Sequence, residues 1–122
     1  MALRTIRKVL GFDRSSHVAT PDAMKIFERD NFRCRYCGLD GKASFENWLI
    51  LTVDFVMPRA RGGHKHGDNL VTACQPCNVI KGTRKFTNFG EARDYVLKRR
   101  EQWRTTFHTQ VLHEKKTALA AG

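Results

Sequence analysis

Two C-x-x-C pairs constrain the fold of this 122-residue chain more than any other feature. They are Cys34 with Cys37 and Cys74 with Cys77, and no other cysteine is present. Each C-x-x-C turn sets two sulfur atoms on one side of a tight loop, and two such turns complete a tetrahedral site for zinc. A domain of this size has a small core, so metal binding would supply folding free energy. The spacing therefore predicts one structural zinc ion held by four thiolates.

Two disulfide bonds are the competing interpretation of the four cysteines. Residues 1–10 are basic, but they lack the apolar stretch and the cleavage site of a secretory signal. We therefore expect a reducing, cytoplasmic location, in which zinc is favoured over disulfides. An organelle transit peptide and a basic arm on nucleic acid both fit residues 1–10, and the arm is the favoured interpretation. A thioredoxin-like redox role needs only one C-x-x-C pair, so the doubled motif argues against it.

The charge of the chain indicates the class of its partner. Twenty-two Lys and Arg against twelve Asp and Glu give a formal net charge of +10. Four thiolates and one Zn²⁺ would lower this by two, to +8, which leaves the domain strongly cationic. Such an excess favours a polyanionic partner. The longest apolar run, residues 48–51, is far below the ~20 residues that cross a bilayer, so we expect a soluble protein with no membrane partner.

Local signals predict alternating short helices and strands. Thr20 and Pro21 mark the start of a helix, and β-branched and aromatic residues predict a strand over 50–57 that stops at Pro58. A glycine-rich cationic loop follows to Asp68. Next come a second short strand or extended piece over 69–73 and a short helix that ends at Gly82. Residues 45–49 fit either a helix or a loop.

The C-terminal part is expected to be one long helix over 88–114. It begins at a capping box of Asn88 and Glu91, and Trp103 and Phe107 are expected to anchor it on the core. We expect residues 1–122 to form a single α+β domain with a frayed tail at 115–122.

Several blocks, in this order, resemble the HNH endonuclease family. They are RDNFRCRYCG at 29–38, LTVD at 51–54, PRARGG at 58–63, NLV at 69–71 and CQPCNVIKG at 74–82. The resemblance implies a ββα-metal (His-Me finger-like) core over 29–82, with zinc knuckles and flanking helices. It also implies metal-dependent hydrolysis of phosphodiester bonds in nucleic acid. We expect double-stranded DNA to be the nucleic acid that is bound.

The resemblance assigns roles to three further residues. Asp54 is at the position of a metal ligand, and Asn69 is at the central position, whose residue braces the loop that holds the general base. Asn78 is at the position of the final metal ligand. One carboxylate and one amide oxygen suit magnesium or manganese.

The residue at one family position cannot perform the chemistry that the family assigns to it. The general base of the family is a histidine directly after the strand carboxylate, and here that residue is Phe55, which cannot accept a proton. A natural variant that kept only binding, an engineered substitution, and a substitute base all fit this change. The candidate substitute bases are His64 and His66, although a His-rich loop tip is more often simply solvated.

Cationic side chains surround this module in the sequence: Arg59, Arg61, Lys65, Lys81, Arg84 and Lys85. We expect them to contact phosphates, because a nucleic-acid groove needs cations to offset backbone charge. The sequence thus predicts an HNH-type endonuclease that is slow or inactive. The alternatives are a non-catalytic, zinc-stabilised nucleic-acid-binding module and, less well matched to the charge, a protein-interaction zinc domain.

Overall fold

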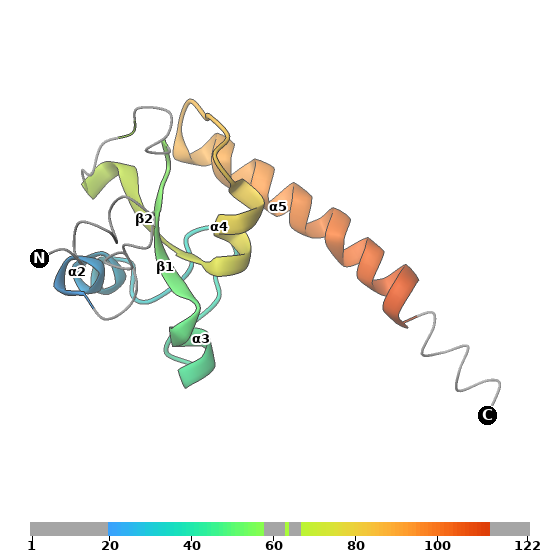
Figure 1. Ribbon diagram of the computed structural model, residues 1–122, viewed down its shortest axis with the longest axis horizontal. Coiled ribbons are helices and arrows are strands. Elements are labelled where there is room, and N and C mark those ends of the chain that lie inside the picture. Colours follow the sequence, from blue (N-terminus) through green and yellow to red (C-terminus); the bar gives the residue numbers. More distant parts are fainter. Residues whose placement is uncertain (1–19, 58–62, 64–66, 113–122) are drawn as a thin grey trace, which may run out of the picture.

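A two-stranded antiparallel hairpin lies at the centre of the molecule (Figure 1). The computed structural model describes residues 20–57, 63 and 67–112. Strand β1 (Leu51–Phe55) pairs with β2 (Leu70–Cys74), with Leu51 opposite Cys74 and Phe55 opposite Leu70. The strand expected over 50–57 is shorter because Ile50 caps the preceding helix, α3 (Phe45–Leu49). Residues 45–49, which fitted either a helix or a loop, therefore form a helix.

Helices cover both faces of the hairpin. Helix α2 (Pro21–Arg29) packs on one face, and α4 (Gln75–Lys81) lies on the other side (Figure 1). Alternate residues of a strand point to opposite faces, so Leu51 and Val53 join the cluster around Phe27 of α2, whereas Val56 joins the cluster that contains the cysteines. β2 is buried along its whole length, which suits a strand covered on both faces.

The predicted start of α2 and the predicted end of α4 are confirmed. The hydroxyl of Thr20 accepts a hydrogen bond from the Ala23 amide, and Pro21 is the first helical residue. Gly82 caps α4 with a φ of 62°, a left-handed conformation in which glycine has no side-chain clash. A short 3-10 turn, η3 (Gly67–Asn69), precedes β2.

The segment between α2 and the first cysteine pair is held by Asp30. Its carboxylate accepts hydrogen bonds from Arg29, Arg35 and the backbone amide of Thr72 in β2. Burial opposes ionisation of Asp30, but the hydrogen bonds from Arg29 and Thr72 outweigh it and lower the pKa of the carboxyl. Asp30 therefore ties the end of α2 to the hairpin.

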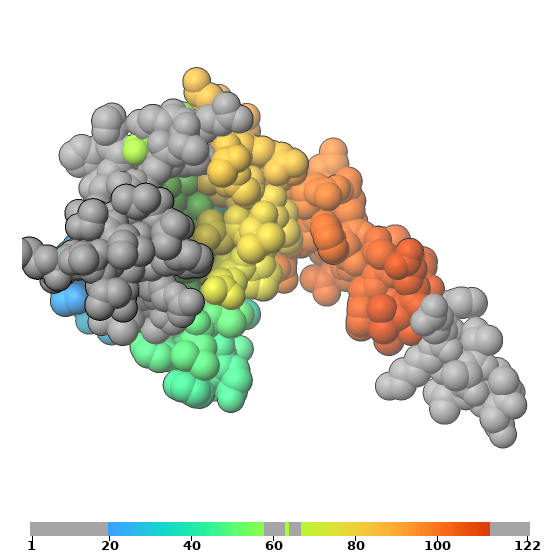
Figure 2. Space-filling view, in the orientation of Figure 1, coloured from blue at the N-terminus to red at the C-terminus, as the bar shows by residue number. Residues whose placement is uncertain are grey.

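The last helix leaves the body of the molecule. Helix α5 (Phe89–Thr106) begins at Asn88, whose side chain caps the amide of Glu91, and it continues as a π-helical stretch, η4 (Phe107–Leu112). Ala92 and Val96 are buried, but every residue from 101 to 112 is exposed, and this part projects away from the rest (Figures 1 and 2).

The expectation that Trp103 and Phe107 anchor the helix on the core is wrong. They are 59% and 47% exposed. The physical reason is the direction of α5, which carries these residues past the end of the core.

None of the helices in the described part of the chain has the length and apolar character that a membrane span requires.

Candidate functional site

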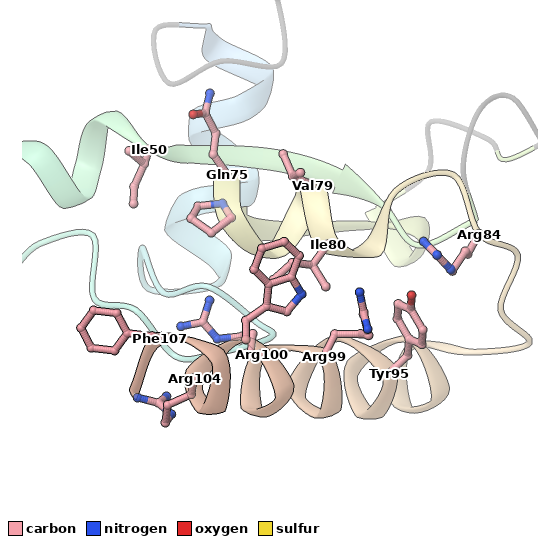
Figure 3. Close-up of a pocket in the computed structure, with 12 residues that line it drawn as sticks. Ile50, Gln75, Val79, Ile80, Arg84, Tyr95, Arg99, Arg100, Arg104 and Phe107 are labelled. Atoms are coloured by element: carbon pink, nitrogen blue, oxygen red, sulfur yellow. The ribbon is translucent and has the colours of Figure 1, made fainter. Parts of the chain in front are cut away.

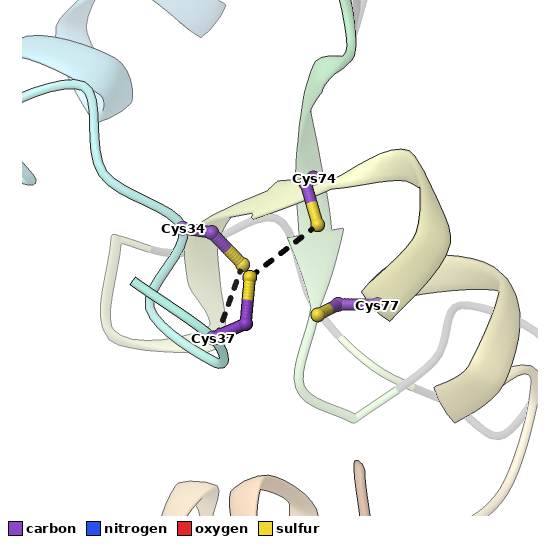
Figure 4. Close-up of side chains that lie close together, drawn as sticks. All are labelled: Cys34, Cys37, Cys74 and Cys77. Atoms are coloured by element: carbon purple, nitrogen blue, oxygen red, sulfur yellow. Dashed lines mark hydrogen bonds between the residues drawn. The ribbon is translucent and has the colours of Figure 1, made fainter. Parts of the chain in front are cut away.

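The four cysteines converge as their spacing predicts (Figure 4). Cys34 and Cys37 lie on a turn in which Gly38 adopts a φ of 82°, and Cys74 and Cys77 lie where β2 ends and α4 begins. All four sulfur atoms lie within 4.8 Å of one another, and all four are unpaired thiols. The Sγ atoms of Cys37 and Cys74 are 3.7 Å apart, well beyond the ~2.05 Å of a disulfide bond. The arrangement is consistent with a structural zinc site.

Each thiol in this cluster shifts the pKa of its neighbours. Hydrogen bonds from Cys34, and then from Cys74 and Cys77, lower the pKa of Cys37, whereas the contacts with Cys34 and Cys37 raise the pKa of Cys77. Without a cation, four adjacent thiols cannot all ionise, because each thiolate opposes the next. The guanidinium of Arg100 on α5 lies 3.6 Å from the Cys77 sulfur, so one charged side chain already faces the cluster.

Asp54 lies on the β1 face that is turned towards α4. It is 4% exposed. The hydroxyl of Tyr36, from the first cysteine turn, donates a hydrogen bond of 2.5 Å to Oδ2, and the ammonium of Lys81 lies 3.4 Å from Oδ1. Burial raises the pKa of Asp54, and the charge of Lys81 opposes that rise. Both carboxylate oxygens therefore have protein partners.

Lys81 has a different place from the one its sequence context indicated. We expected a phosphate contact, but Lys81 is 0% exposed. Its Nζ atom donates to the Phe55 carbonyl at 2.8 Å and pairs with Asp54. A buried ammonium needs a charge partner and hydrogen-bond acceptors, and these two groups supply them. In this position Lys81 cannot reach a phosphate at the surface, and the expectation is corrected accordingly.

Phe55 points to the opposite face of β1 from Asp54. It is half-buried and packs against the apolar cluster that includes Phe27 and Leu70. An apolar ring suits this environment better than a polar imidazole, which would have to pack against the same apolar residues. The residue that the resemblance places at the general-base position is thus part of the packing between the hairpin and α2.

Asn69 joins the two ends of the segment between the strands. Its Oδ1 accepts from the Met57 amide at 2.8 Å, its Nδ2 donates to the Met57 carbonyl at 3.1 Å, and its carbonyl accepts from the Val56 amide. These bonds fix where the chain leaves β1 and where it returns before β2. Asn78 is half-buried on α4, one turn before Lys81 and on the same side of the helix.

The remaining predicted site residues fall into two groups. Arg84 and Lys85 follow α4 and are exposed. The others lie outside the described residues: Arg59, Arg61, His64, Lys65 and His66.

Comparison with known proteins adds one finding to this geometry. Residues 34–84 match the family model described as HNH endonuclease. This segment is an HNH endonuclease domain. The match begins at the first cysteine and ends at Arg84, close to the range of 29–82 expected from the sequence. No curated protein and no solved structure is significantly similar to the chain. The HNH family implies a nucleic-acid substrate.

The divalent cation that the HNH family implies does not fit the described arrangement. Asp54 and Asn78 supply oxygen atoms of the right type, but Lys81 already places a positive charge beside the carboxylate. A second cation at the same oxygen would be repelled at short range. The four cysteines, in contrast, fit zinc in number, type and convergence.

Two residues of this site have no signal in the sequence. Tyr36 occupies a variable position of the first C-x-x-C pair, and Arg100 lies 23 residues beyond Cys77. Only the fold places Tyr36 at Asp54 and Arg100 at Cys77. A buried tyrosine hydroxyl needs a partner, but the sequence gives no indication of which one.

Proposed function

We propose that this chain binds DNA through its HNH domain, with one structural zinc, and that it lacks hydrolysis at the rates of a complete HNH site. The observation that carries this proposal is the buried contact between Asp54 and Lys81. It satisfies the one carboxylate that the family uses for its cation. Phe55 supports the same conclusion, because loss of a positioned general base typically costs about 10² to 10⁴ in rate.

Binding is supported by the charge of the chain. A net charge of +10 draws a polyanion to the surface and releases counterions when phosphates are neutralised. Arg84 and Lys85 are exposed directly after α4, and Arg59, Arg61 and Lys65 belong to the same interface in this proposal. The HNH family implies a nucleic-acid substrate, and we take duplex DNA as the first candidate.

Metal-dependent cleavage is the second candidate function. Asp54, Asn69 and Asn78 all occupy family positions, and a chain that had lost the reaction altogether would be free to change them. Cleavage would require Lys81 to leave Asp54 so that magnesium or manganese could approach, and it would require a base such as His64 or His66. A slow endonuclease is the expected outcome of that arrangement.

The two functions are separated by plasmid cleavage and duplex binding measured on the same protein. Supercoiled plasmid is incubated with the chain in magnesium, manganese, nickel or zinc, beside Phe55→His and Asp54→Ala. We expect duplex binding that weakens steeply from 50 to 200 mM salt, and no cutting by the unmodified chain. Phe55→His is expected to cut only in a metal that displaces Lys81 from Asp54.

A matched control guards against contaminating nuclease. Phe45→His places the same imidazole on α3, at an exposed residue outside the site, and it should leave the plasmid intact. Cutting by the unmodified chain that Asp54→Ala abolishes would overturn the non-catalytic proposal and establish the second function. Absence of any salt-dependent duplex binding would overturn both.

A further inference from the structure

A groove of about 850 Å³ lies between α4 and α5, on a side of α4 that the HNH site does not use (Figure 3). Gln75, Pro76, Val79 and Ile80 line it from α4, whereas Cys77 and Lys81 of the same helix are buried. Helix α4 therefore contributes Cys77 and Lys81 to the buried contacts described above and other residues to the groove.

The floor of the groove is apolar and open to solvent. Val79 is 77% exposed, and Trp103 and Phe107, four residues apart on one side of the last helix, also line it. Tyr95 adds a third aromatic ring. Exposed aromatic side chains collected in one concave surface indicate a binding site more than scattered surface residues do.

Arginines surround this apolar floor. Arg84, Arg99, Arg100 and Arg104 line the groove, and no described lining residue is acidic. Arg99 and Arg100 project from α5 towards α4 (Figure 3). The Arg84 guanidinium lies 4.9 Å from the centre of the Tyr95 ring, a geometry in which an arginine holds an aromatic face and keeps its charge available. The groove thus combines flat apolar surfaces with positive charge and has an anionic ligand as its complement.

We propose that this groove binds a short single-stranded stretch of DNA. A single strand carries phosphates for the arginines and, in the same polymer, unpaired bases whose faces stack on aromatic side chains. In a duplex those faces are covered by neighbouring bases. An acidic amphipathic peptide would match the charge but would not explain why the groove shares α4 with a domain whose family acts on nucleic acid. The inference rests on the proposed function and adds a second contact surface to it.

The direct test uses the fluorescence of Trp103. The chain has two tryptophans, so Trp48→Phe leaves Trp103 as the only tryptophan, which is excited at a wavelength where tyrosine does not absorb. Addition of octathymidylate is expected to quench this emission, and an octamer duplex at the same total phosphate concentration should quench it less. In an anisotropy measurement with labelled octathymidylate, Trp103→Ala should weaken binding by about 5- to 150-fold, the effect of one stacked base.

Charge variants test the rim of the groove. Arg99→Gln and Arg104→Gln should each reduce the slope of log affinity against log salt by about 0.7, the value for one lost phosphate contact with a single strand. The matched controls are Phe45→Ala, an exposed aromatic on α3, and Lys98→Gln, an exposed cation on α5; neither residue lines the groove. Both controls should bind octathymidylate as the unmodified chain does.

The outcomes separate this inference from the proposed function. Duplex binding without any change in Trp103 emission, or groove variants that bind octathymidylate like the controls, would overturn the groove assignment alone. Equal quenching by duplex and single strand would overturn the preference for unpaired bases. Quenching by a glutamate- and leucine-rich helical peptide but not by octathymidylate would make the groove a protein-docking surface. Loss of all nucleic-acid binding would instead remove the proposed function itself.

Discussion

The four-cysteine cluster and the Asp54 site are two sets of metal-ligand residues that the fold treats in opposite ways. The four sulfur atoms face one another with one guanidinium beside them, so a divalent cation is needed to balance their charge when they ionise. The Asp54 carboxylate already has an ammonium and a hydroxyl as partners. Ligand type and spacing are therefore insufficient to define a metal site, because the charge balance around the ligands decides whether a cation is required.

The largest expected effect comes from breaking the cysteine cluster. Cys77→Ser should expel zinc and unfold the domain, since structural zinc typically contributes about 10–16 kcal/mol and whole domains have stabilities of about 5–15 kcal/mol. Circular dichroism and zinc content measure the result. Val79→Ser, on an exposed position of the same helix, should fold and keep its zinc. A folded, zinc-free Cys77→Ser protein of normal stability would refute the structural role of the metal.

Removing the Lys81 ammonium should leave the Asp54 carboxylate in need of a cation, as the four cysteines are. Lys81→Met leaves the buried Asp54 carboxylate without its charge partner, at an expected cost of about 3–5 kcal/mol, measured by urea unfolding. Manganese should then bind more tightly than in the unmodified chain, as measured by calorimetry.

Two variants accompany Lys81→Met. Lys85→Met, at an exposed lysine four residues later, should change neither quantity. In the double variant Asp54→Asn/Lys81→Met the loss of stability should be smaller than the sum of the single losses. A Lys81→Met protein with unchanged stability and unchanged manganese affinity would show that Lys81 does not control the Asp54 site.

A smaller effect is expected at the charge that faces the cysteines. Arg100→Gln removes the guanidinium beside Cys77, and loss of such an outer contact typically lowers metal affinity by about 10- to 100-fold. Competition with a chelator measures this affinity. Arg93→Gln, an exposed arginine on the same helix, is the matched control, and equal zinc affinity in the two variants would contradict a role for Arg100 at the metal.

The smallest expected effect concerns Asp30 and Asp54, two carboxyl groups whose pKa values are shifted in opposite directions. The pKa of Asp30 is lowered and that of Asp54 is raised. A lowered pKa gives stability that is present above the unfolded value of about 3.9 and lost only as the pH falls through the folded value. Asp30→Asn should therefore cost about 1–2 kcal/mol, with the same difference from the unmodified chain at pH 8 and at pH 5.5.

Unfolding in zinc-saturated buffer at both pH values measures this difference. Asp94→Asn, an exposed carboxylate on α5, is the control and should stay near zero. A difference for Asp30→Asn that disappears by pH 5.5 would contradict the lowered pKa.

Much of the local structure was predictable because its causes lie within four residues of each other. Thr20 with Ala23, Asn88 with Glu91 and Gly82 at the end of α4 are all confirmed. The shorter β1 and the helix α3 were less clear, because a segment of five apolar and polar residues fits more than one structure until its neighbours are placed.

The predicted functional residues divide along the same line. The convergence of four cysteines followed from their spacing, whereas the burial of Lys81 did not, because the sequence cannot distinguish a phosphate contact from an internal ion pair. Trp103 and Phe107 were expected in the core for their apolar character, but the path of α5 leaves them exposed. The roles of Asp54, Asn69 and Asn78 stay predictions that the proposed variants test.

The sequence by itself determined the four-cysteine cluster, the HNH resemblance, the helix caps and the excess of positive charge, since each depends on residue type and short spacing. Only the tertiary structure decided that Lys81 pairs with Asp54, that Tyr36 and Arg100 reach the two ligand sets, and that an arginine-lined groove opens between α4 and α5. The physical reason is that ion pairs, buried hydroxyls and grooves are formed by residues brought together across the fold, and their energies depend on burial, which no local pattern specifies.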